Sequence, residues 1–502
     1  MKQFLKNIGK ALRTERATRI TVTALVIGVV IALNAVVYAL TAVYGLYFYK
    51  DNSLDLSLSD APTAVLSKAE ADGKQVTVLF CQSVEDVKSN ATGAPVYETA
   101  RQMAERFPSL IQLEFVNVVI HPERVEKYRD EANGQYVSVG SVIFIHGDNF
   151  RVYTTLGTTA GYADFYTVDA STGSIVAYNG EEAMTAGILW VLQDEHKKVY
   201  LTKGHSETAT LTLTTLLGYA GYTVETIDLH NTEVPSDAEM VIISNPVQDF
   251  EKAGSVAVRA ELVRLQSYMD RGGTVMAMLD PYLKTDLSNL KAFLAQYGIT
   301  VATVETDGGT RTVGTVRDTT GGVSLDGMSL TSVIGTGKIG SVLSEAVRKH
   351  TNGAIKMSWT AALSIDESKG AEALLLSSPT ATLEAGGKTV DREGGYALIG
   401  YGERERDGAT SRVVVVPSVY LTESGAMISN AYANRDFLYA LLDTLDESEQ
   451  TMPYHCRMAI VTQTTLENLT VGTARLLTVL TLLLPAALAV TGTVVLLRRK
   501  YR

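Results

Sequence analysis

Four polar side chains that could bind a ligand or take part in hydrolysis follow predicted strand ends in the middle of the chain: His205, Glu207, Asn245 and Asp280. In an open parallel sheet, the carboxyl ends of the strands form the crevice in which ligands bind. If the strands are neighbours, the four side chains face one crevice that suits a polar ligand or a peptide from a partner. The structural alternative is that Ser206 caps a helix and that the Asn-Pro and Asp-Pro pairs make turns.

These residues are positioned by residues 198–281, in which predicted strands alternate with predicted helices. Strand-like apolar runs lie at 198–202, 222–229, 240–243 and 274–279. Between them, apolar residues recur at helical spacing, first at 211–217 and then from Val258 to Met269. This alternation predicts βαβ units and a parallel sheet, so the predicted fold class is α/β.

Other chemical motifs are incomplete. The strand-to-helix turns lack the G-x-S-x-G elbow of a hydrolase. Residues 335–338 (GTGK) resemble part of a phosphate loop, but Ile339 stands where Ser or Thr would bind magnesium, so ATP hydrolysis is not expected. No Cys or His pair has zinc-ligand spacing, and neither a metal nor a cofactor is predicted.

The two cysteines, Cys81 and Cys456, could pair or stay free. Cys81 follows a predicted strand, where a redox cysteine could stand. Because the chain has no C-x-x-C motif, a packed and unreactive thiol is the favoured interpretation.

Both ends of the chain have the composition of membrane anchors. Residues 20–48 and 476–497 contain no charged residue, and each is longer than the roughly 20 residues that cross a bilayer. Basic residues dominate 1–19 and 498–502, and such residues stay in the cytoplasm. The net charge is −11, so the middle of the chain is strongly acidic. An acidic exterior argues against binding to nucleic acid.

The remaining segments predict a smaller domain before the central one and further elements after it. The smaller domain has the order βαβαββ, with strands at 75–80 and 111–119, helices at 95–107 and 121–132, and a hairpin over 141–153; this order suggests a thioredoxin-like fold. Residues 181–193 predict an amphipathic helix. Later elements are strands at 373–376, 396–401 and 412–416, a helix at 434–445, and a last strand at 457–463 that returns to the central sheet.

The predicted organisation has two membrane spans around an exterior α/β body. In chain order it is a cytoplasmic basic tail (1–19), a transmembrane helix (20–48), a stalk (49–74), a small α/β domain (75–180), a central α/β domain (181–455) with a Gly- and Thr-rich excursion of loops and short strands (302–345), a membrane-proximal segment (456–475), a transmembrane helix (476–497) and a cytoplasmic basic tail (498–502).

Several phrases of the sequence resemble one known family. They include KVYLTKGHSE at 198–207, VPSDAEMVIISNP at 234–246, SYMDRGGTVMAMLDP at 267–281 and NLKAFLAQYGI at 289–299. Together with one span at each end, they resemble the GldG-like auxiliary component of gliding-motility-type ABC (ABC-2) transport systems. The Gly- and Thr-rich 302–345 region departs from the family pattern.

The resemblance implies a non-enzymatic subunit that works with a separate ABC ATPase and a polytopic ABC-2-type permease in the plasma membrane. It also implies a central domain similar to amidotransferase- or flavodoxin-like α/β domains, without a catalytic cysteine. Two alternatives stay open. One is a divergent extracytoplasmic hydrolase that uses His205, Glu207 and Asp280, and the other is a free-standing receptor for a peptide or glycan.

Overall fold

The computed structural model describes residue 28 and residues 55–130, 135–155, 164–168, 175–252, 260–283, 285–306, 309–350, 353–427, 429, 431–446, 452–460, 492, 494 and 498. The chain forms two compact units, residues 1–53 with 463–469 and residues 54–462 with 470–502, and every element below belongs to the second. The predicted spans at 20–48 and 476–497 lie outside the described residues, apart from Gly28, Gly492 and Val494. No helix within the described ranges has the length and apolarity needed to cross a bilayer.

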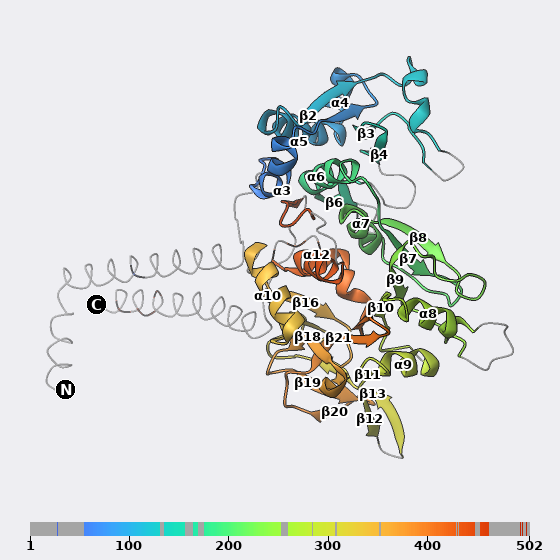
Figure 1. The fold of residues 1–502 in the computed structure, drawn as a ribbon. Coiled ribbons are helices and arrows are strands. Elements are labelled where there is room, and N and C mark those ends of the chain that lie inside the picture. Colours follow the sequence, from blue (N-terminus) through green and yellow to red (C-terminus); the bar gives the residue numbers. More distant parts are fainter. Residues whose placement is uncertain are drawn as a thin grey trace. The chain divides into compact units, whose positions relative to one another are not determined.

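A four-stranded mixed sheet occupies the first part of the described chain (Figure 1). Its order is β2-β1-β3-β4, with β1 and β2 parallel and the other pairs antiparallel. The strands are β1 (Val76–Phe80), β2 (Ile111–Phe115), β3 (Ser141–His146) and β4 (Asn149–Thr154), and the helices are α3 (Ala61–Ala71), α4 (Val84–Ser89) and α5 (Gly93–Arg106). The predicted hairpin is confirmed, and Gly147 takes the left-handed conformation (φ 58°) that its tight turn requires.

Two predictions in this region are wrong. In place of a helix at 121–132, the described residues form two short 3₁₀ turns, η1 (Pro122–Arg124) and η2 (Glu126–Tyr128). Val125 between them has φ −117°, outside the helical region, so the two turns cannot merge into one helix. Residues 61–71, expected in a polar stalk, form α3, whose Leu66 is fully buried in the core.

The central sheet has eleven strands. Its main path is β16-β15-β18-β21-β22-β10-β9-β7-β8, and β11 and β17 join it at the side. The strands are β7 (Lys198–Thr202), β8 (Thr223–Ile227), β9 (Ala238–Ser244), β10 (Thr274–Met278), β11 (Ile299–Val301), β15 (Ser329–Ile334), β16 (Ile355–Ser358), β17 (Leu363–Ile365), β18 (Ala371–Ser377), β21 (Ala397–Arg406) and β22 (Ala409–Val416). Strands β8, β7, β9, β10 and β22 are parallel neighbours, so the α/β class with a parallel-strand sheet is confirmed.

Helices cover both faces of this parallel part. Alternate residues of a strand point to opposite faces, and the two hydrophobic cores follow that rule. Val199, Ile242, Met276 and Val414 belong to one core and Val241, Ile243, Val275 and Val413 to the other. The first core includes residues of α7 (Leu211–Tyr219), α10 (Lys338–His350) and α12 (Asn434–Leu445), and the second includes residues of α8 (Glu261–Met269) and α9 (Ser288–Ala295).

The Gly- and Thr-rich region is more regular than expected. The hairpin of β12 (Thr303–Thr306) and β13 (Thr310–Val313) is separate from the sheet of β14 (Thr315–Arg317), β19 (Thr382–Ala385) and β20 (Lys388–Asp391). The prediction of only loops and short strands for 302–345 is wrong at its end, because α10 begins at Lys338.

The last strand also differs from its prediction. The short strand β23 (Ala459–Ile460) does not return to the central sheet. It pairs with β6 (Ile175–Tyr178), which pairs in turn with β5 (Tyr166–Val168).

Helix α6 (Gly180–Val191) is buried nearly all round, so its predicted amphipathic character is wrong. It packs against elements on several sides, among them α3, α5, β3, β4 and α7. Its Glu182 is 1% exposed; it accepts a hydrogen bond from the Tyr439 hydroxyl at 2.6 Å and pairs with Arg435 Nη1 at 3.3 Å. A buried charge needs such partners, so this network fixes α6 against α12.

Candidate functional site

The predicted crevice lies at the carboxyl edge of β7 and β9, which are neighbours in the sheet. After β7, Gly204 (φ 120°) and Ser206 (φ 58°) turn the chain back. The His205 carbonyl accepts hydrogen bonds from the backbone N–H groups of Val247 (2.8 Å) and Gln248 (3.2 Å). The loops that follow the two strands are therefore bonded to each other.

The imidazole of His205 lies between two carboxylates. Its Nδ1 is 3.2 Å from Glu207 Oε1, and its Nε2 is 3.0 Å from Glu261 Oε2. The ring stacks on Phe250, with the ring centroids 3.9 Å apart. The histidine is only 6% exposed, so both ring nitrogens are engaged inside the protein.

The electrostatics favour a charged imidazolium. Burial alone lowers the pKa of His205, but the hydrogen bond to Glu207 and the negative charges of Glu261 and Glu207 outweigh it, and the net pKa is raised. Burial raises the pKa of Glu207, yet the hydrogen bonds from the imidazole and from backbone N–H groups reverse this, and the net pKa is lowered. Both shifts favour the ion pair over the neutral pair.

Asn245 and Asp280 lie at the same edge but do not join this cluster. The Asn245 side chain donates to Thr208 Oγ1 at 2.9 Å, and its backbone is left-handed (φ 54°). The Asp280 carboxylate accepts the backbone N–H of Tyr282 at 2.8 Å, which closes the turn after β10. No hydrogen bond or ion pair between described residues joins Asp280 to His205.

The sequence prediction missed Glu261, a residue that is 3% exposed and whose carboxylate also accepts the backbone N–H of Glu251 at 2.8 Å. It opens α8, the crossover between β9 and β10. A crossover helix starts at the carboxyl edge of a parallel sheet. The predicted topology could therefore have indicated that an acidic residue in the first turn of this helix lies at the same sheet edge as His205.

This arrangement is better suited to holding the loops together than to catalysis. A general base needs a proton of the substrate within about 3 Å, whereas both nitrogens of His205 already contact carboxylates. Within the described ranges, no group of three or more His, Cys, Asp or Glu side chains could hold a metal ion.

The two cysteines are free and buried. Cys81 directly follows β1 and lines a cavity of about 360 Å³. Burial raises the pKa of its thiol to about 12, so it is protonated at neutral pH. Because the thiolate is the reactive form, the packed interpretation of Cys81 has the better physical support.

The GTGK segment forms the entry to α10, and a carboxylate of the protein already occupies its N-terminus. Glu372 Oε1 accepts the backbone N–H groups of Ile339 (2.6 Å) and Gly340 (3.2 Å). A β-carbon on Gly337 would stand 1.8 Å from Glu372 Oε2, which explains the glycine there. An internal anion thus lies where a phosphate loop would hold phosphate.

Three half-exposed aromatic side chains gather at the carboxyl edge of the sheet. Tyr282 follows β10, Trp359 follows β16 and Tyr420 follows β22, and they are 40–43% exposed. The Trp359 ring centroid is 5.5 Å from that of Tyr282 and 6.2 Å from that of Tyr420. We call these three residues the aromatic cluster. They come from separate segments, so no local sequence pattern predicted them.

A second cluster joins a segment that follows the first predicted span to a segment that precedes the second. Arg457 pairs with Asp55, and its Nη1 donates to Ser57 Oγ at 2.6 Å. The Glu181 carboxylate accepts the backbone N–H groups of Ser59 and Arg457, each at 2.8 Å. We call these five residues the end clamp.

Comparisons with known proteins assign no family. No protein-family model matches the chain, and no curated protein does. Among solved structures, it is similar to the "Structure of PurLQS from Thermotoga maritima", with 10% sequence identity and a TM-score of 0.28 over 50% of this chain and 100% of that one. A likeness at this TM-score supports no conclusion about the fold or the function of this chain.

Proposed function

We propose that this chain is a non-enzymatic, membrane-anchored auxiliary subunit of an ABC-2-type transporter. Its α/β body would lie outside the cell, between spans at 20–48 and 476–497, with both basic tails in the cytoplasm. The partners would be a separate ABC ATPase and a polytopic permease in the plasma membrane. The sequence resemblance and the charge pattern at both ends support this assignment.

The end clamp is the observation that carries the proposal. It brings residues 55–59, which follow the first predicted span, against Arg457, which precedes the second. A body on two neighbouring membrane anchors needs its first and last segments close together. The clamp provides this, and Glu181 connects both segments to the buried helix α6.

The state of the predicted crevice favours a non-enzymatic role over a hydrolase. The hydrolase alternative requires His205, Glu207 and Asp280 to act on one substrate. His205 is bonded to Glu207 and Glu261 away from solvent, while Asp280 closes a turn. We infer that the cluster stabilises the loops at this edge.

We assign the contact with the permease to the aromatic cluster. Exposed aromatic side chains that lie together commonly mark protein interfaces. Trp359 has a left-handed backbone (φ 50°), and its backbone N–H donates to the Met328 carbonyl at 2.8 Å. Such strain persists where the surrounding structure enforces it, often for function.

We also infer finer fold relationships. The strand order β2-β1-β3-β4, with one parallel pair followed by a hairpin, supports a thioredoxin-like small domain. The parallel order β8-β7-β9-β10-β22, with helices on both faces, supports an amidotransferase- or flavodoxin-like central domain.

The test is purification of the tagged full-length protein from its native host in mild detergent, followed by mass spectrometry. An ATP-binding subunit and a multi-span permease in near-equal amounts would support the proposal. An unrelated tagged protein with two spans, purified in parallel, controls for membrane proteins that co-purify nonspecifically. If the chain is recovered alone under conditions that keep other transporter complexes intact, the proposal fails.

A further inference from the structure

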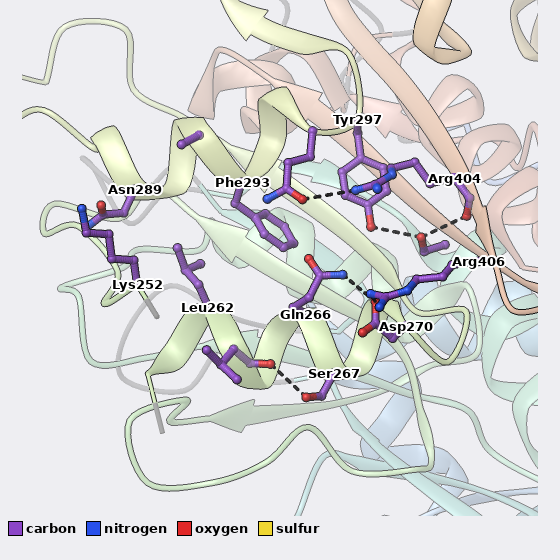
Figure 2. A pocket seen from close by; sticks show the side chains of 14 residues that line it. Lys252, Leu262, Gln266, Ser267, Asp270, Asn289, Phe293, Tyr297, Arg404 and Arg406 are labelled. Carbon is purple, nitrogen blue, oxygen red and sulfur yellow. Dashed lines mark hydrogen bonds and ion pairs between the residues drawn. The ribbon is translucent and has the colours of Figure 1, made fainter. Parts of the chain in front are cut away.

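A groove of about 550 Å³ runs between α8 and α9 (Figure 2). This volume is within the range of roughly 300–1,000 Å³ that is usual for ligand pockets. Gln266 and Ser267 of α8 line one wall, and Asn289 and Phe293 of α9 line the other. No residue of the His205 cluster or of the aromatic cluster lines it.

The hairpin of β21 and β22 closes one end of the groove with two arginines. Successive side chains of a strand point to opposite faces. Arg404 and Arg406 are two residues apart, so they lie on the same face, and both line the groove. Glu403 belongs to the other face, where its carboxylate accepts the hydroxyl of Tyr401 at 2.9 Å. The alternating sequence of this hairpin thus concentrates positive charge on the groove side.

The two arginines differ in how their charge is balanced. Arg406 Nη1 is 2.8 Å from Asp270 Oδ1. Arg404 instead donates to the neutral side-chain oxygen of Gln296 at 3.2 Å, and its guanidinium lies 5.4 Å from the ring centroid of Tyr297. No described carboxylate forms an ion pair with Arg404, so its charge is available to a ligand.

The groove is therefore positive in an acidic protein. Its described lining contains three cationic side chains, Lys252, Arg404 and Arg406, and one carboxylate, Asp270. The whole chain carries a net charge of −11. A local reversal of sign indicates an anionic ligand, and the forked guanidinium of arginine suits a carboxylate.

The rest of the groove suits an amide-bearing ligand with an apolar side chain. Phe293 and Tyr297 are 3% and 1% exposed and form an aromatic floor. Gln266 donates its amide to Asp270, which leaves its side-chain oxygen as an acceptor. Gln296 accepts from Arg404, which leaves its NH₂ group as a donor. A peptide unit could donate to the first and accept from the second.

We propose that this groove binds the carboxyl end of a short, extended peptide. Arg404 would bind the terminal carboxylate, Gln266 and Gln296 would bind the last peptide group, and the aromatic floor would take an apolar side chain. The proposal goes beyond the transporter assignment and does not depend on it.

The test compares two probes that differ only in charge: N-acetyl-Ala-Ala-Phe with a free carboxylate, and the same peptide with a C-terminal amide. Binding to the full-length protein in detergent is measured by isothermal titration calorimetry. We expect the acid to bind at least tenfold more tightly than the amide. Equal binding of the two, or no binding of the acid, would overturn the proposal. So would competition by inorganic phosphate at the concentration of the acid, because it would indicate a simple anion site.

Variants test the position of the site. Arg404 is exposed, so Arg404→Gln should fold, with a melting temperature close to that of the wild type; we expect it to lose the tenfold preference for the acid. Glu405→Gln changes a charge at the adjacent exposed position of the same hairpin and should keep the preference. Ser267→Trp should fill the groove and abolish binding of both probes. If Arg404→Gln keeps the preference for the acid, the carboxylate is bound elsewhere and the proposal fails.

Discussion

His205 and Glu207 show how burial determines the role of polar residues in this chain. The imidazole is held between Glu207 and Glu261 and stacked on Phe250. A buried charge pair adds little when compared with apolar packing, but removing one partner is costly because the other charge stays buried. The cluster should therefore affect the stability of the fold more than any reaction.

Replacing His205 with glutamine tests this role. We expect His205→Gln to lower the free energy of unfolding by about 3 kcal/mol, because two buried carboxylates lose their cationic partner. Thermal and urea unfolding, followed by tryptophan fluorescence, measure the loss. Asp280→Asn is the control, since an asparagine oxygen can still accept the Tyr282 N–H, and its cost should stay within about 0.5 kcal/mol. Equal effects of the two substitutions would contradict the buried-cluster interpretation.

The same variant should show a particular pH dependence. The folded pKa of His205 is raised above its unfolded value of about 6.5, so its stabilisation is complete below that pH and is lost as the pH rises through the raised pKa. Glu207 has a lowered pKa, so its contribution is lost only as the pH falls through that lowered value. The stability difference between wild type and His205→Gln should therefore be larger at pH 6 than at pH 9. A difference that grows toward pH 9 would contradict the direction of the His205 shift.

Two of the three ionisable residues of this cluster were predicted from the sequence. His205 and Glu207 are two residues apart, so one strand-end turn identified both. Glu261 is 56 residues away from the histidine and meets it only because α8 starts at the same sheet edge. Asp280 follows the same kind of strand end, yet its carboxylate faces its own turn. Spacing along the chain thus predicts which residues lie at the carboxyl edge of the sheet, whereas the direction of each side chain depends on the local turn.

At the scale of elements, the N-terminus of α10 shows an internal cap in place of a ligand site. We expect Glu372→Ala to cost about 1 kcal/mol, because it removes the acceptor for the Ile339 and Gly340 N–H groups. Chemical unfolding of the wild type and of the variant measures this loss. The matched control is Glu367→Ala, on an exposed 3₁₀ turn without such a capping role. An equal loss in both would contradict the capping role of Glu372.

The end clamp is an element-scale contact with a local effect. Arg457 is 41% exposed at its side chain, so Arg457→Ala should cost less than about 1 kcal/mol in global stability. It should nevertheless release residues 55–57, whose Asp55 and Ser57 contact the Arg457 side chain, and increase their cleavage in limited proteolysis. Lys369→Ala, which removes another partly exposed ion pair, is the control and should leave that cleavage unchanged. Equal cleavage in the wild type and Arg457→Ala would show that the clamp does not hold the segment.

Periodicity predicted the elements whose pattern is uninterrupted. Residues 198–202 and 434–445 form a strand and a helix with the expected limits, because their apolar spacing agrees with their environment. The Gly-rich composition before α10 suggested loops, whereas the helix that follows is fixed by a distant cap, Glu372. The short strand β23 pairs with β6, a contact that local sequence does not contain. Elements that depend on partners far along the chain were the ones missed.

At the scale of the whole molecule, the aromatic cluster should determine assembly. We expect Trp359→Ala to reduce the amount of permease that co-purifies by at least tenfold, because central aromatic contacts often contribute about 2 kcal/mol or more to an interface. Quantitative mass spectrometry of matched purifications measures this ratio. Val333→Ala, at another exposed apolar position, should leave the ratio unchanged. An unchanged ratio in Trp359→Ala would remove the cluster from the interface.

The proposed exterior body, anchored in the membrane at both ends, is tested most directly by cysteine labelling in intact cells. The native background suits the method, because Cys81 and Cys456 are each 1% exposed. Single cysteines are introduced as Lys338→Cys, at a side chain that is 83% exposed on the body, and as Lys6→Cys and Tyr501→Cys in the tails.

A membrane-impermeant maleimide should label Lys338→Cys in intact cells, and should label Lys6→Cys and Tyr501→Cys only after the membrane is permeabilised. Labelling of either tail in intact cells, or protection of the body until permeabilisation, would contradict the proposed arrangement.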